Sequence, residues 1–139
     1  MYDFSFGDVQ VTRIVEMEMP LLEGRTFFPD WNEAAIAPHA DWMVPRHYQP
    51  DTGLVVIAIQ AFLIRTRKHT ILVDSCVGNH KPRNRAFFND AEFPWMERFA
   101  AAGVSPEDID FVLCTHLHVD HVGWNTKLVD GRWVPTFPN

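Results

Sequence analysis

Three histidines and one aspartate lie within the six positions 116–121, directly after an apolar stretch. Residues 110–116, DFVLCTH, have the pattern of a short buried strand that leads into this cluster. Neutral imidazole and carboxylate are good ligands for zinc and its first-row neighbours. One histidine after a strand is usually a satisfied core or surface residue, but packing alone does not explain such a cluster. The sequence therefore predicts a metal site whose ligands are His116, His118, Asp120 and His121.

The spacing of these four residues predicts two metal positions rather than one. Residues two apart in an extended loop point to the same side, so His116 and His118 can converge on one ion. If the chain then turns into a helix, Asp120 and His121 project toward a second point nearby. Two neighbouring ions lower the pKa of a bridging water and hold both the attacking and the leaving oxygen of a hydrolysis.

The chain before the motif is rich in predicted strands. Residues 9–19 alternate apolar and polar side chains, as a half-buried strand does. Residues 54–66 form a β-branched run, and 69–75 follow it as the second strand of a hairpin. The basic stretch 64–69, IRTRKH, lies between these runs and is interpreted as their turn.

Two helical signals and a second hairpin complete the pattern. A helix is predicted over 93–102, ended by Gly103, and a single helical turn over 105–109 begins at Ser105. Residues 126–137 are predicted to form a hairpin with Asp130-Gly131 as its turn. Strands followed by helix, strand and loop indicate mixed α/β layers rather than an all-β sandwich.

Composition excludes several classes of protein. Apolar residues make up 47% of the 139 residues and charged residues 22%, as in soluble globular proteins. The net charge of −6 argues against a phosphate-binding surface for nucleic acid, which needs clustered Lys and Arg. No window is long and apolar enough for a membrane span, and the N-terminus lacks the features of a signal peptide, so a cytoplasmic location is expected. The two cysteines, Cys76 and Cys114, are interpreted as small buried side chains at strand ends.

Residues 20–50 differ from the rest of the chain. They hold half of the ten prolines, together with several Phe and Trp residues. Proline interrupts both helices and strand ladders, and a long segment of this composition is unusual as a plain connector. Two interpretations stay open: a lid or binding loop, or a surface loop whose aromatic side chains pack on the domain.

The motif THLHVDHVG, residues 115–123, resembles the signature of the metallo-β-lactamase superfamily. Upstream, ILVDSCVG at 71–78 resembles the strand, aspartate and glycine-containing turn that precede the signature in this family. The resemblance extends from about residue 54 to 125. It implies that Asp74 supports the metal loop from behind, and carboxylates in such positions orient metal ligands.

The resemblance also implies an αββα sandwich built from two similar halves. In the family the second half adds a histidine, a bridging aspartate and a final histidine, whereas no histidine follows His121 here and Asp130 belongs to the predicted turn. Residues 1–139 are thus expected to form the N-terminal part of the domain, with 20–50 as insert or lid and 110–125 as the metal-binding strand and loop.

The implied activity is that of a metallo-hydrolase with two zinc ions, for which Mn, Fe or Co are alternatives. The layout, with VDSCVGNHKPR before the motif and DHVGWNT after it, most resembles the lactonase and methyl-parathion-hydrolase-like branch. Such an enzyme uses a metal-bridged hydroxide, with Asp120 also catalytic, to attack an ester, lactone or related bond of a small, fairly apolar substrate. Alternatives are a β-lactam, thioester or phosphodiester hydrolase, or a non-catalytic truncated fragment or binding remnant. The expected partner is a small-molecule substrate, without nucleic acid or membrane, and a homodimer is compatible with the sequence.

Overall fold

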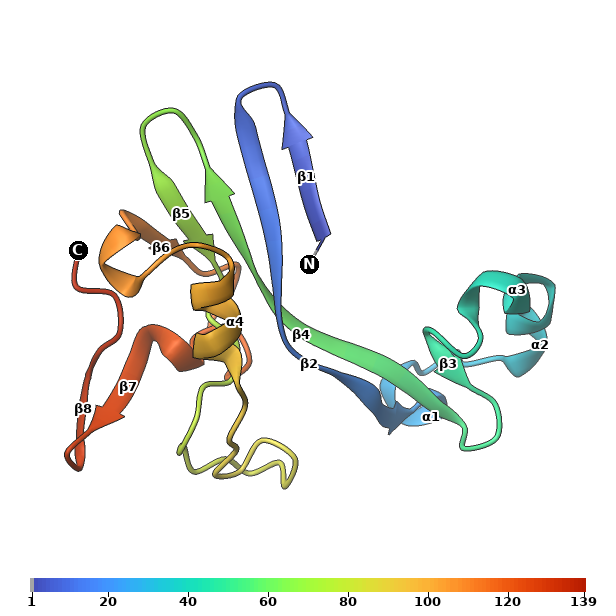
Figure 1. The fold of residues 1–139 in the computed structure, drawn as a ribbon. Helices are drawn as coiled ribbons and strands as arrows, with labels where there is room; N and C mark the ends of the chain where they lie inside the picture. The colour runs from blue at the N-terminus through green and yellow to red at the C-terminus, as the bar shows by residue number, and fades with distance from the viewer. Residues whose placement is uncertain (1) are drawn as a thin grey trace. The chain divides into compact units, whose positions relative to one another are not determined.

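The alternating and β-branched segments form one six-stranded sheet in the computed structural model, which describes residues 2–139 (Figure 1). Its order is β1-β2-β4-β5-β6, and β3 pairs with β4 beside this path. The β1–β2, β3–β4 and β4–β5 pairs are antiparallel, whereas β5 and β6 are parallel. The strands are β1 (Tyr2–Phe6), β2 (Val9–Glu23), β3 (Tyr48–Gln49), β4 (Leu54–Arg65), β5 (Thr70–Val73) and β6 (Phe111–Leu113). The prediction of mixed α/β structure is confirmed.

Two compact units share these strands. The first joins the N-terminal segment up to Glu16 to Ile59–Asn139, and the second is Met17–Ala58. Strands β2 and β4 each continue from one unit into the other. All four predicted metal ligands belong to the first unit.

The parallel pairing of β5 and β6 determines where the metal loop begins. Val73 lies opposite Leu113 in the register, so both strands end at the same edge of the sheet. Asp74 and Cys114 therefore leave the sheet side by side, and the Asp74 amide donates to the Leu113 carbonyl at 2.8 Å. This edge brings together two segments that lie 40 residues apart in the sequence.

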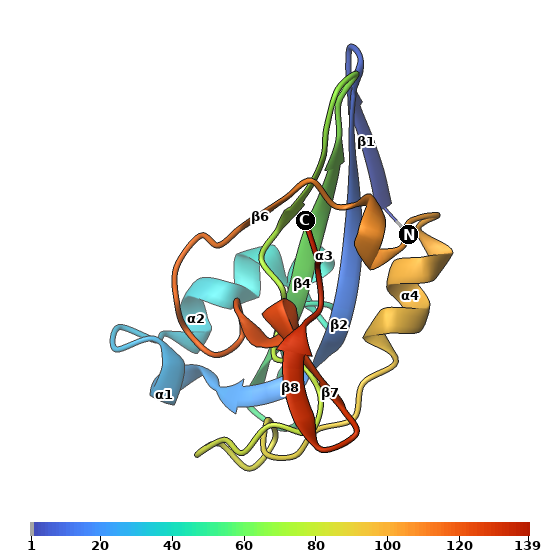
Figure 2. The same ribbon diagram turned by 90° about the vertical axis from the view of Figure 1, so that its left-hand side faces the viewer.

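Helix α4 (Trp95–Ala101) covers β2 in the first unit (Figure 2). The Arg98 guanidinium donates to the backbone carbonyls of Val15 and Glu16 at 2.8 and 2.9 Å. Trp95 and Phe99 are fully buried and stack with ring centroids 5.1 Å apart. Gly103 ends the helical segment at φ 76°, as predicted, because a residue without a side chain tolerates this left-handed conformation.

Two further predicted turns are confirmed. Strands β7 (Thr126–Val129) and β8 (Arg132–Pro135) form the predicted hairpin, and Asp130 and Gly131 both have positive φ, as a type I′ turn requires. The Asp108 carboxylate accepts a hydrogen bond from the Ser105 amide at 2.7 Å, which begins the short 3-10 helix Pro106–Asp108.

The prediction that β6 is buried is wrong. Phe111 and Leu113 are 50% and 52% exposed, whereas Val112 between them is half-buried. Within the described residues, β6 pairs only with β5. Cys114 is half-buried rather than buried, whereas Cys76 is fully buried and burial raises the pKa of its thiol well above the usual value. Strand β1 was not predicted, although its sequence, YDFSF, alternates aromatic and polar residues.

The second unit has its own small core. Ile36, Tyr48 and Val55 are buried there, and Trp31 packs against them. The Trp31 indole lies over Gly24, where any side-chain carbon would overlap it. Short helices connect these residues: α1 (Gly24–Phe27), α2 (Glu33–Ile36), the 3-10 helix Ala37–His39 and α3 (Ala40–Met43). The proline-rich segment 20–50 thus folds around an aromatic core that includes Trp31 and Tyr48.

Helices that could span a membrane are not found within residues 2–139.

The exposed β6 edge predicts that residues 1–139 expressed alone associate with themselves. An apolar edge strand offers unpaired backbone groups and uncovered side chains to another copy. Leu113→Lys places a charge on this edge, and we expect it to shift the chain toward monomer in sedimentation velocity. Leu128→Lys on the β7–β8 hairpin, which also replaces an exposed leucine by lysine, serves as the matched control. A wild-type chain that is monomeric at high concentration contradicts this prediction.

Candidate metal centre

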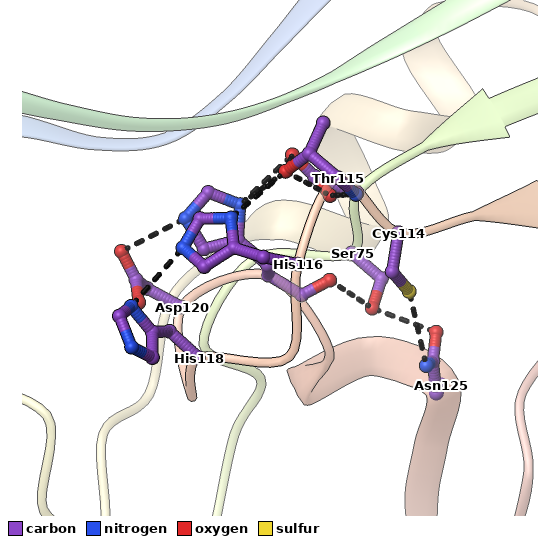
Figure 3. A network of polar contacts seen from close by, with 9 residues as sticks. Ser75, Cys114, Thr115, His116, His118, Asp120 and Asn125 are labelled. Carbon is purple, nitrogen blue, oxygen red and sulfur yellow. Dashed lines mark hydrogen bonds and ion pairs between the residues drawn. The ribbon is translucent and has the colours of Figure 1, made fainter.

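The four predicted ligands lie on the loop that follows β6 (Figure 3). Two backbone hydrogen bonds shape this loop: the His121 amide donates to the His118 carbonyl at 3.0 Å, and the Ser75 amide donates to the His121 carbonyl at 2.9 Å. The turn at 118–121 swings His121 back toward the end of β5. The chain then forms a 3-10 turn, Gly123–Asn125, instead of the helix considered from the sequence.

The three histidine rings converge. The ring centroids of His116 and His121 are 3.9 Å apart, and those of His116 and His118 are 4.6 Å apart. His116 and His118 are exposed, whereas the side chains of Asp120 and His121 retain 27% and 25% of their accessible surface. The loop therefore presents its polar side chains together and open to solvent.

The potential metal-binding atoms form two pairs. His116 Nε2 lies 3.1 Å from His118 Nδ1, and His121 Nε2 lies 3.3 Å from Asp120 Oδ2. Two ligand atoms on one tetrahedral zinc ion are about 3.3 Å apart, given metal–ligand distances of about 2.0–2.1 Å. Each pair therefore has the spacing of two ligands of a common ion, while the two metal positions stay a prediction.

Each pair is an incomplete set. No group of three or more His, Cys, Asp or Glu side chains within residues 2–139 is arranged to hold a metal ion. Zinc sites in proteins take roughly three or four protein ligands. The residues present fit a metal centre in the chemistry and spacing of their donor atoms, and an ion bound here needs further ligands.

Asp74 lies directly behind the loop. Its carboxylate contacts His121 Nδ1 at 2.8 Å and accepts hydrogen bonds from the amide of Thr115 at 2.8 Å and from its hydroxyl at 2.9 Å. Burial opposes ionisation, but these hydrogen bonds outweigh it and lower the pKa of the Asp74 carboxyl. The structure thus brings Asp74 against the ligand for which the resemblance implied it, while its support of a bound metal stays a prediction.

Sequence reasoning missed several polar residues around the loop. Thr115 links Asp74 to the histidines, since its hydroxyl lies 3.1 Å from His116 Nδ1 and 3.3 Å from His121 Nδ1. Below it, the Ser75 hydroxyl donates to Asn125 Oδ1 at 2.8 Å, and Asn125 Nδ2 lies 3.7 Å from Cys114 Sγ (Figure 3). Thr115 was recognisable from its place beside the first histidine, whereas Ser75 and Asn125 meet only through the fold.

Comparisons with known proteins agree with this geometry. A sequence model of the metallo-beta-lactamase superfamily matches residues 54–139. The N-acyl homoserine lactonases AiiB of Agrobacterium fabrum and of Rhizobium rhizogenes are each 28% identical over 103 residues, which cover 66% of this chain and 37% of the relative. The chain thus spans little more than a third of the length of these curated relatives.

Solved structures show the same fold. The hydrolase AbOPH of the beta lactamase superfamily superposes with a TM-score of 0.68 at 29% identity, over 99% of this chain and 42% of its own. AidC, a dizinc quorum-quenching lactonase, reaches 0.69 at 20% identity, with the same two coverages. The fold is therefore the mixed α/β fold of these proteins, present here as part of the domain. Because the family match covers the β4–β5 hairpin, the Asp74 turn and the whole histidine loop, this chain belongs to the metallo-β-lactamase superfamily.

Proposed function

We propose that the full-length protein, meaning this chain with whatever its coding sequence adds, is a metal-dependent hydrolase that opens ester or lactone bonds in small, fairly apolar substrates. The observation that carries the proposal is the pair of donor sets on one loop, with His116 beside His118 and Asp120 beside His121. Family membership and the similarity to N-acyl homoserine lactonases support the reaction class.

The chain's own residues would divide the work as follows. His116 and His118 would hold one zinc ion, and Asp120 with His121 would hold the second. When bound, the two ions lower the pKa of a water molecule and polarise the bond to be broken. The Asp74 carboxylate would accept a hydrogen bond from the Nδ1–H of His121, which leaves Nε2 free as a ligand. The Asp120 carboxylate would accept a proton from the attacking water and then pass it to the leaving group.

Hydrolysis by purified full-length protein tests this reaction class. The substrate panel contains an N-acyl homoserine lactone, an aryl ester, a β-lactam, a thioester and a phosphodiester. We expect the highest kcat/KM for the lactone or the ester, loss of activity with a chelator, and recovery when zinc is added. A preference for the β-lactam, thioester or phosphodiester contradicts the substrate class. Protein that binds zinc but hydrolyses none of the five supports the non-catalytic alternative.

If segment 20–50 is the binding loop considered from the sequence, its exposed aromatic side chains contact the substrate. Phe27 and Phe28 are 49% and 48% exposed and meet edge to face, with centroids 4.8 Å apart. Trp31 belongs to the core of that unit and is a poor choice for a test. Phe27→Ala and Phe28→Ala are expected to raise KM for long-chain or aryl substrates more than for short ones. Trp42→Ala, which removes another exposed aromatic of the same unit, is the control. Equal effects across chain lengths would show that the two phenylalanines do not contact substrate.

A further inference from the structure

Glu16 on β2 is a buried carboxylate that the proposed chemistry does not use. It is 1% exposed, and its two oxygens accept three hydrogen bonds. Oε2 accepts from the Val77 amide at 2.8 Å, and Oε1 accepts from the Gly78 amide at 3.1 Å and from Trp124 Nε1 at 2.7 Å. Burial raises the pKa of the Glu16 carboxyl, although these donors and the Arg98 guanidinium oppose the rise.

The three hydrogen-bond donors come from two segments beside the metal loop, one that follows Asp74 and one that follows His121. Val77 and Gly78 follow Asp74 after β5, and Trp124 follows His121 after the turn. These segments are joined by the Gly123 amide, which donates to the Cys76 carbonyl at 2.7 Å, and by the Trp124 amide, which donates to the Ser75 carbonyl at 2.7 Å.

The two segments touch through their backbones. A side-chain carbon on Gly123 would lie 1.8 Å from the Val77 carbonyl oxygen, so only glycine permits this approach. Trp124 is 7% exposed and stacks on Trp95 with ring centroids 5.4 Å apart, which aims its indole N–H at Glu16. The Glu16 carboxylate thus accepts hydrogen bonds from both of these closely packed segments.

We propose that Glu16 is a positioning residue of the metal loop, which holds the 74–78 segment against the 121–125 segment and so keeps His121 on Asp74. A carboxylate suits this position because it accepts without donating and all three partners are donors. Glutamine has the same shape, but its amide nitrogen must face a backbone or indole N–H, so at least one of the bonds is lost. The expected effect of Glu16 on metal binding rests on the proposed function, whereas its role in holding the two segments together does not.

Glu16→Gln in the full-length protein tests the proposal through two independent measurements. The first is amide hydrogen exchange of the metal-free protein, in which we expect about tenfold or faster exchange at Ser75, Gly123 and Trp124. The amides of the β4–β5 ladder are the internal reference. The second is zinc affinity, measured by competition with a chromophoric chelator, which we expect to fall by about 10- to 100-fold. The melting temperature is measured beside both.

Two other variants separate positioning from folding. Trp124→Phe keeps the aromatic stack and removes one donor, so it should change exchange and zinc affinity in the same direction by less. Glu97→Gln removes a carboxylate from α4 and should change neither. Unaltered exchange in Glu16→Gln overturns the proposal, as does faster exchange spread equally over the β4–β5 ladder, which would indicate general loss of stability. If wild-type protein binds no zinc, the proposed function fails while the exchange result still decides the role of Glu16.

Discussion

Asp120→Asn is expected to lower kcat of the full-length protein by at least about 100-fold, the usual loss when a general acid or base is removed. The carboxylate lies 3.3 Å from His121 Nε2, on the open side of the loop. Asparagine keeps the shape of the side chain while it removes the charge and the proton acceptor. The effect should therefore appear in kcat rather than in KM.

Metal content decides how this result is interpreted. Elemental analysis of the Asp120→Asn protein is required beside the kinetics, because the same carboxylate is a predicted metal ligand. Asp130→Asn changes an exposed carboxylate in the β7–β8 turn and is the matched control. Near wild-type turnover by an Asp120→Asn protein that retains both ions would rule out the proton-transfer role.

The double variant His116→Ala/His118→Ala is expected to lose one of two bound ions. These two imidazoles form one donor pair, with 3.1 Å between Nε2 and Nδ1, whereas Asp120 and His121 form the other. Removal of one pair should therefore leave the second position partly intact. Elemental analysis of full-length protein should give about two metals per chain for wild type and about one for the variant.

A second double variant tests whether the loss of any two histidines lowers the metal content. His69→Ala/His80→Ala removes two histidines that are not predicted ligands and that contact Asp110 and Glu92. We expect its metal content to equal that of wild type. Metal content that is unchanged in the His116/His118 variant would refute the assignment of this pair as ligands.

Local sequence signals were sufficient for much of the fold. The β4–β5 hairpin, the helix that ends before Gly103 and the Asp130-Gly131 turn were predicted from neighbouring residues, because strand alternation, helix ends and turn conformations depend on contacts within a few positions. The boundaries of β2 and of the second unit were less predictable. The alternating pattern indicated a strand over 9–19, but β2 continues to Glu23, where its residues pack with a separate core.

The sequence by itself determined the cluster of three histidines and one aspartate that predicts a metal site, because these four residues are close in the chain. Only the tertiary structure decided what surrounds the loop. The family resemblance implied that Asp74 lies behind the loop, and the structure shows its contact with His121 across 47 positions. Glu16 meets Trp124 across 108 positions, and no pattern along the chain marks that pair. The exposure of β6 likewise could not be predicted from the sequence, because an apolar strand has the same pattern whether or not another layer covers it. Burial and long-range hydrogen bonds depend on which segments the folded backbone brings together, and this is set by the packing of the whole sheet rather than by any one segment.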